Sequence, residues 1–200
     1  MKAPNPINNQ NPTTPQKKES KLSLIRRRGP ANPQGKIYLR TENSIRRAIC
    51  VGLSRRYLGL QARTVFRTAR ITAPAFYSHA ENVNSALINY ETSLERELVE
   101  ALPKSPKREM AWTILLHFIS RNRDYFRATF KTHNLYLISR LINHMRYILV
   151  GTGDVSDKSY AIYTANAIGV IQCWANYDHF DKDLIDYYVK KLMQIRFMRF

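Results

Sequence analysis

The sequence has little glycine and almost no cysteine. Seven of its 200 residues are Gly, and it contains neither a G-x-G-x-x-G string nor a P-loop string, which argues against a fold built on Gly-rich phosphate loops. The two cysteines, Cys50 and Cys173, fall on apolar faces of expected helices, where we expect buried thiols. A chain with two cysteines is neither a disulfide-rich secreted scaffold nor a zinc module held by several cysteines.

Acidic residues are scarce relative to basic ones. The chain holds 15 Asp and Glu against 32 Lys and Arg, which gives a formal net charge of +17. This excess favours a polyanionic partner, either nucleic acid or an anionic membrane face. Membrane attachment is the weaker interpretation, because stable attachment needs an apolar anchor and the basic N-terminal segment has none.

Long apolar runs are missing as well. Residues 1–20 contain no apolar segment of the kind that a signal peptide needs. The uncharged stretch Ser159–Tyr177 is too polar for a membrane span and is better interpreted as a buried helix. Its polar residues include Thr164, Asn166, Gln172 and Asn176. We therefore expect a cytoplasmic protein without a membrane partner.

The first 40 residues differ in composition from the rest. Six of the nine prolines fall in residues 1–36, where apolar residues show no helical or strand spacing. Up to Arg40 the segment carries nine Lys or Arg and a single acid, Glu19. This composition predicts a disordered basic tail over residues 1–40. The run Arg26–Arg28 would either bind nucleic acid non-specifically or enter the minor groove of DNA.

From Thr41 onward, apolar residues recur at intervals of three and four, and no alternating strand pattern is present. We predict an all-α fold of about nine helices. Residues 41–102 would form a three-helix helix-turn-helix domain with a long connecting helix, and residues 103–200 a helical dimerisation and effector domain. Gly59 is expected to stop the first helix, Thr72 to cap the third, and residues 134–150 to form one helix.

Charge supports a nucleic-acid-binding unit in the first part of this region. Residues 41–80 contain seven Arg and one acid, Glu42, whereas residues 81–102 contain five Glu and one Arg. Three short helices with a tight break between the second and third are typical of a helix-turn-helix. Arginine forks suit phosphate groups, although an arginine-rich solvated face is the plainer alternative.

Three separated motifs resemble the tetracycline-repressor (TetR/AcrR) family of transcription regulators. Residues 69–79, Ala-Arg-Ile-Thr-Ala-Pro-Ala-Phe-Tyr-Ser-His, are similar to the turn and recognition helix of that family. Residues 119–126, Ile-Ser-Arg-Asn-Arg-Asp-Tyr-Phe, resemble the N-x-D-F-F string of its Gram-positive type of C-terminal domain. Residues 168–174, Ile-Gly-Val-Ile-Gln-Cys-Trp, resemble a string on the penultimate helix. The resemblance covers about residues 41–197.

The resemblance implies a homodimer that binds double-stranded DNA at a palindromic operator. The DNA-contacting residues would be Arg46, Arg47, Arg63, Arg67, Thr72, Ala73, Pro74, Ala75, Tyr77, Ser78 and His79. Arg70 stands where the family has Gly, so this turn must be made without a residue that enters positive φ freely. From the residues alone, half-buried packing is the alternative to a phosphate contact for Tyr77, and His79 is equally well interpreted as a packed or capping histidine.

Residues 156–177 are apolar on two faces, a pattern typical of a helix buried on both sides. The resemblance implies that this helix and the last one form a four-helix dimer interface, whereas a central helix of a monomer is the alternative. The expected interface residues are Ala165, Gly169, Cys173, Trp174, Leu184, Tyr188 and Leu192. An effector, if the regulator has one, would bind an apolar pocket lined by Trp112, Leu116, Tyr136, Met145 and Tyr163.

No enzyme, cofactor or metal site is expected. The sequence shows no recognisable Ser/His/Asp or paired-carboxylate pattern, and four histidines lack ligand spacing with Cys or acidic residues: His117, His133, His144 and His179. The leading hypothesis is a DNA-binding transcription regulator, most simply a repressor. The alternative is a non-catalytic interaction protein of the same fold, whose degenerate recognition unit binds nucleic acid non-specifically or binds a protein partner.

Overall fold

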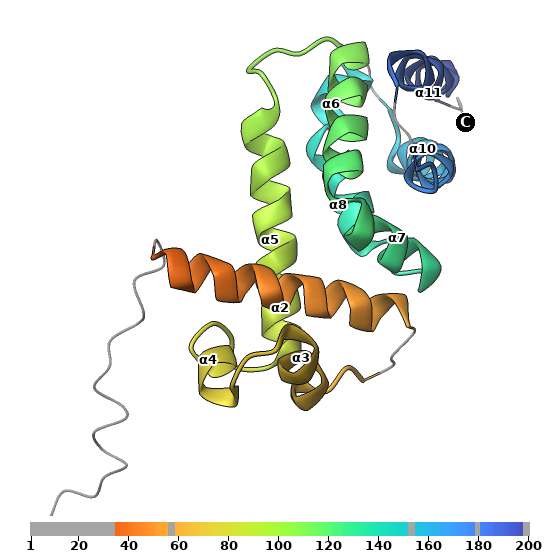
Figure 1. The fold of residues 1–200 in the computed structure, drawn as a ribbon. Helices are drawn as coiled ribbons and strands as arrows, with labels where there is room; N and C mark the ends of the chain where they lie inside the picture. Colours follow the sequence, from red (N-terminus) through yellow and green to blue (C-terminus); the bar gives the residue numbers. More distant parts are fainter. Residues whose placement is uncertain (1–34, 56–58, 152–154, 179–180, 198–200) are drawn as a thin grey trace, which may run out of the picture.

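The computed structural model describes residues 35–55, 59–151, 155–178 and 181–197. Every regular element in these ranges is a helix, and ten helices, α2 to α11, follow one another along the chain (Figure 1). The prediction of an all-α fold is confirmed. Most of the expected basic tail, residues 1–34, lies outside the described residues, and so does His179.

The N-terminal unit is built from α2 (Lys36–Ser54), α3 (Ala62–Ala69), α4 (Ala73–Tyr77) and the start of α5 (Val83–Ala101). Its small core takes residues from all four helices and from the turn after α4. The buried members are Ile45, Ala48, Ile49, Val65, Phe76, Ala80 and Ala86. This unit has its own apolar centre, and among its helices only α2 and α5 also contribute residues to the larger core.

Helix α5 connects the two halves of the molecule. It starts with a capping box, in which the Ser85 amide donates to the Asn82 side chain at 2.8 Å and the Asn82 amide donates to the Ser85 hydroxyl at 3.0 Å. Ala86, on its first turns, belongs to the small core, whereas Leu94 and Leu98 belong to the large one. The long connecting helix is therefore shared by both bodies, as its sequence predicts.

The C-terminal body contains six helices around the large core. These are α6 (Arg108–Arg121), α7 (Arg123–Lys131), α8 (Tyr136–His144), α9 (Arg146–Val150), α10 (Asp157–Ala175) and α11 (Lys182–Gln194). Trp112 and Trp174 are fully buried, and the Trp174 indole donates to the Leu116 carbonyl at 3.0 Å. That bond joins α10 to α6 and satisfies a polar group that burial would otherwise penalise.

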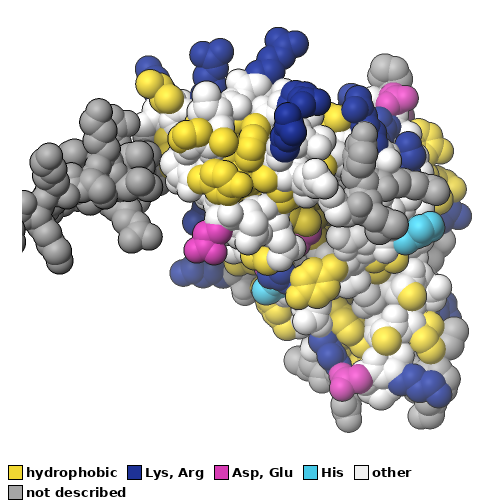
Figure 2. All heavy atoms as spheres, turned by 90° about the horizontal axis from the view of Figure 1, so that it is seen from below, with side chains coloured by type: hydrophobic (Ala, Val, Ile, Leu, Met, Phe, Trp, Pro, Cys, Tyr) yellow, Lys and Arg dark blue, Asp and Glu magenta, His cyan; other side chains and the backbone are white. Residues whose placement is uncertain are grey.

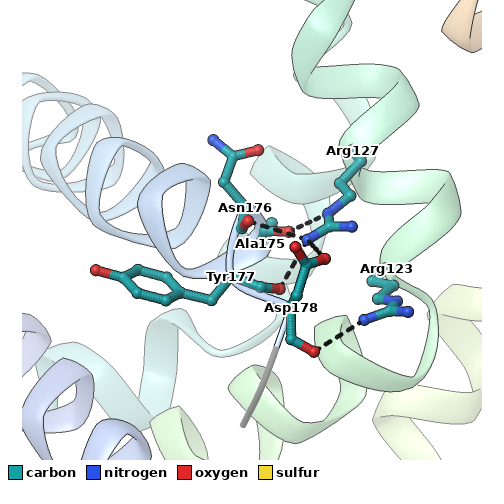
Figure 3. A network of polar contacts seen from close by, with 6 residues as sticks. All are labelled: Arg123, Arg127, Ala175, Asn176, Tyr177 and Asp178. Atoms are coloured by element: carbon teal, nitrogen blue, oxygen red, sulfur yellow. Dashed lines mark hydrogen bonds and ion pairs between the residues drawn. The ribbon is translucent and has the colours of Figure 1, made fainter.

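An arginine of α7 closes the end of α10 (Figure 3). The Arg127 guanidinium donates to the Ala175 carbonyl at 2.7 Å and to the Tyr177 carbonyl at 2.7 Å. It also contacts the Asn176 carbonyl and the Asp178 carboxylate. A cation at this position satisfies carbonyls that have no partner within the helix and suits the negative end of the helix dipole.

Three expected boundaries differ from the structure. Helix α2 begins at Lys36, so the expected tail ends before residue 40, and α2 ends at Ser54 with Arg55 as its cap. Gly59 has a positive φ but does not follow α2 directly, because Arg55 already closes its last turn. The stretch 134–150 is divided at Met145, whose fully buried side chain anchors the bend between α8 and α9.

None of the described helices combines the length and apolarity that crossing a membrane requires. The uncharged stretch around residues 159–177 forms most of α10, and one side of that helix is buried in the large core.

Candidate nucleic-acid interface

Helices α3 and α4 pack together through aromatic rings. The Phe66 ring lies 5.2 Å from the Phe76 ring and 5.8 Å from the Tyr77 ring, measured between centroids. Phe76 is fully buried, whereas Tyr77 keeps 55% of its surface exposed. Phe66 thus fills the space between the two short helices and positions the outward-facing Tyr77.

The turn between α3 and α4 is made by a residue with a side chain. Arg70 has φ 56° and ψ 45°, in the left-handed region that glycine enters without a steric cost. Two residues later, the Thr72 hydroxyl accepts a bond from the Ala75 amide at 3.3 Å and caps α4. The cap predicted at Thr72 is therefore present, and the turn is tight despite the missing glycine.

The surface formed by α3 and α4 combines apolar and cationic side chains. Figure 2, which looks at the molecule from this side, shows hydrophobic side chains gathered on the surface with Lys and Arg side chains along one edge. On α4 and its flanking residues, Thr72, Pro74, Tyr77 and Ser78 are exposed, and Ala73 and Ala75 are half-buried. Arg63, Arg67 and Arg70 are exposed on and just after α3. We call this surface, residues 63–78, the α3–α4 face.

His79 is half-buried against α2. Its ring stacks on Tyr38 of α2, and its Nδ1 atom is buried without a hydrogen-bond partner among the described residues. Burial lowers the pKa of His79, and nearby Glu42 partly offsets that shift. His79 is therefore a packed histidine in this structure, the second of the two interpretations that its sequence allows.

Arg46 and Arg47 lie apart from the α3–α4 face. Arg46 forms an ion pair with Glu42 and stacks over the Tyr90 ring, 5.1 Å from its centroid. Both arginines line a cleft between α2 and α7, whereas α3 and α4 pack on the other side of α2 (Figure 1). The structure therefore groups Arg63 and Arg67, but not Arg46 and Arg47, with the expected recognition helix.

The expected dimer residues divide into two groups. Ala165, Gly169 and Cys173 are exposed along one side of α10. Trp174, Tyr188 and Leu192 are buried in the chain's own core, so these three are wrongly placed at an outer surface, whereas Leu184 is half-buried and its expected role stays a prediction. Cys173 also corrects the expectation of two buried thiols: only Cys50 is buried, and burial raises its pKa to about 11.

The expected effector pocket is not formed by the residues predicted for it. Trp112, Leu116, Met145 and Tyr163 are fully buried and pack in the large core, while Tyr136 is 63% exposed. Apolar residues at helical spacing filled the core instead of lining a cavity. A hollow of about 920 Å³, the α2–α7 cleft, was not predicted from the sequence because its walls come from segments far apart in the chain.

A second, small hollow of about 60 Å³ lies inside the N-terminal unit, beside His79, Glu42 and Tyr90. Among the described residues, no three His, Cys, Asp or Glu side chains gather in a way that could hold a metal ion.

Comparison of the chain with protein-family models, with curated proteins and with solved structures found no match.

Proposed function

We propose that this chain is a DNA-binding transcription regulator of the tetracycline-repressor type, which acts as a homodimer on a palindromic operator. The observation that carries the proposal is the α3–α4 face. A short helix capped by Thr72 stands exposed beside three exposed arginines, on a unit that has its own core. A recognition helix of this kind enters the major groove while cations on the preceding helix contact phosphates.

The residues at the start of α4 favour a particular mode of DNA reading. Thr72, Ala73, Pro74 and Ala75 include no Arg, Asn or Gln that could form a bidentate contact with a base. Methyl groups of Ala and Thr suit contact with the thymine methyl group. Specificity therefore depends mainly on thymine methyl groups and on how easily the site deforms.

A binding-site selection on the full chain tests the proposal. The wild type is expected to enrich a palindromic site, and Ala73→Arg is expected to change the bases preferred at one position in each half-site. Met110→Arg serves as the matched control, because Met110 is an exposed residue of α6 in the C-terminal body and the change adds the same charge. Absence of any enriched site, or identical sites for wild type and Ala73→Arg, would contradict the proposal.

A second function has specific support. Arg70 makes a left-handed turn where the family that the chain resembles has Gly, and His79 packs on Tyr38 instead of facing DNA. These departures favour a non-catalytic interaction protein whose α3–α4 face binds nucleic acid non-specifically or binds a protein. Under that alternative, DNA affinity falls steeply with salt and is the same for all sequences.

A further inference from the structure

We propose that the α2–α7 cleft binds a small molecule that carries two or more phosphate or carboxylate groups. The cleft measures about 920 Å³, within the roughly 300–1,000 Å³ typical of small-molecule sites. Cys50 of α2 and Tyr125 of α7, both buried, lie on its inner side. Its walls are therefore formed by the N-terminal unit on one side and by the C-terminal body on the other.

The charge around the cleft selects anions. Six lining residues are basic and two, Glu97 and Asp124, are acidic. The basic ones are Arg46, Arg47, Arg121, Arg123, Arg127 and Lys131. A hollow lined mainly by one sign of charge concentrates ligands of the opposite sign.

Three of these cations are committed to protein partners. Arg123 and Arg127 hold the end of α10, as Figure 3 shows, and Arg46 is paired with Glu42. Even so, the Arg46 Nε atom is buried and lacks an acceptor among the described residues. Because Arg46 also lines the small hollow beside His79, this donor is not assigned to a ligand of the cleft.

The other three cations are uncommitted. Arg47, Arg121 and Lys131 are exposed and make no hydrogen bond or ion pair within the described part of the chain. They come from α2, from the end of α6 and from the end of α7, so a ligand that contacts all three needs more than one charged group. This requirement favours a multiply charged anion over a single carboxylate.

The position of the cleft argues against DNA as the occupant. α7 covers the side of α2 opposite to α3 and α4 (Figure 1), so a duplex on the α3–α4 face is separated from the cleft by α2. A ligand that contacts both α2 and α7 would instead fix the N-terminal unit against the C-terminal body. An effect of this ligand on DNA affinity rests on the proposed function, whereas its binding does not.

Calorimetric titration of the full chain at about 150 mM salt, where long-range attraction is screened, tests binding directly. Pyrophosphate and citrate are the two probes, and they distinguish phosphate from carboxylate ligands; acetate is the singly charged control. We expect one site per chain for at least one probe and none for acetate. Combined Arg47→Gln, Arg121→Gln and Lys131→Gln should weaken that site about tenfold or more.

The matched control removes the same number of charges from the α3–α4 face, through Arg63→Gln, Arg67→Gln and Arg70→Gln. This variant should keep the wild-type affinity for the anion. Equal losses in the two triple variants would show general attraction to a basic protein and would overturn the proposal, as would the absence of binding to the wild type. Amide shifts on adding the probe provide a check without substitution: they should centre on α2 and α7, and shifts confined to α3 and α4 would contradict the site.

The two proposals can fail separately. If the anion binds the cleft but the chain enriches no DNA site, the regulator function fails and the anion site stands. If both hold, the bound anion should change DNA affinity in the wild type and leave it unchanged in the cleft triple variant.

Discussion

The ring of His79 lies almost flat against the ring of Tyr38, with centroids 3.8 Å apart and planes 26° from parallel. This stack joins the segment just after α4 to the first turn of α2. Burial lowers the pKa of His79, so the folded chain holds fewer protons at this site than the unfolded chain. The free energy of unfolding therefore depends on pH through this site.

We expect the stabilisation contributed by His79 to be complete above its ordinary pKa of about 6.5 and to be lost as the pH falls below that value. The thermal midpoint of the wild type should drop between neutral and mildly acidic pH, and His79→Gln should reduce that drop. His117→Gln, at an exposed position of α6, is the control and should leave the pH dependence unchanged. Parallel pH profiles for the wild type and His79→Gln would contradict this role.

The left-handed conformation of Arg70 predicts that glycine is more stabilising than alanine at this position. Because its φ of 56° costs a residue with a Cβ roughly 1 kcal/mol, Arg70→Gly should be more stable than Arg70→Ala by about that amount in urea unfolding. At Thr92, an exposed residue in the middle of α5, the order should be reversed, with Ala more stable than Gly, because glycine weakens a helix interior. The same order at both positions would show that the turn is not strained.

Removing the cation that closes α10 should destabilise the protein. Arg127→Gln loses charge-assisted bonds to carbonyls at the helix end, and we expect a loss of about 2 kcal/mol in the free energy of unfolding. Arg96→Gln is the control, since Arg96 is exposed and makes only a long ion pair with Glu100, of the kind worth less than about 1 kcal/mol. If the two changes lower the free energy of unfolding equally, the bonds from Arg127 to the end of α10 do not stabilise the fold more than a surface ion pair does.

Local signals in the sequence predicted much of the fold. Apolar residues at intervals of three and four predicted the long helix α5, Thr72 was correctly predicted to cap α4, and the apolar pattern of residues 156–177 predicted a buried side of α10. The break at Met145 escaped prediction because apolar spacing continues through it. The early start of α2 escaped prediction because Ile37 and Leu39 are exposed and show no amphipathic pattern with the tail.

The candidate sites were harder to predict because they depend on which side of a helix a residue faces. Arg46 and Arg67 look alike in sequence, but the first lies on α2 at the α2–α7 cleft and the second is exposed on α3. Trp174 and Cys173 are neighbours, yet one is buried and the other exposed. Such differences arise from packing between segments that are distant in the sequence. The spacing of apolar residues along the chain does not predict that packing.

The exposed side of α10 provides the test of the dimer. Gly169 has no atom within 4 Å of the position where a Cβ would stand, so the fold of a single chain does not require glycine there. Glycine nevertheless weakens a helix by about 0.5–1 kcal/mol relative to alanine, which makes its presence beside Ala165 and Cys173 costly unless another surface approaches closely. We expect that surface to be the same face of a second chain.

Gly169→Arg should therefore leave the monomer folded and disrupt the dimer, because an arginine cannot be buried unpaired in an apolar interface. Sedimentation at micromolar concentration should give a dimer for the wild type and a monomer of unchanged helicity for the variant. Val99→Arg, which places the same side chain at an exposed apolar position of α5, should remain dimeric. A monomeric wild type, or a dimer that tolerates Gly169→Arg, would exclude this face of α10 as the interface.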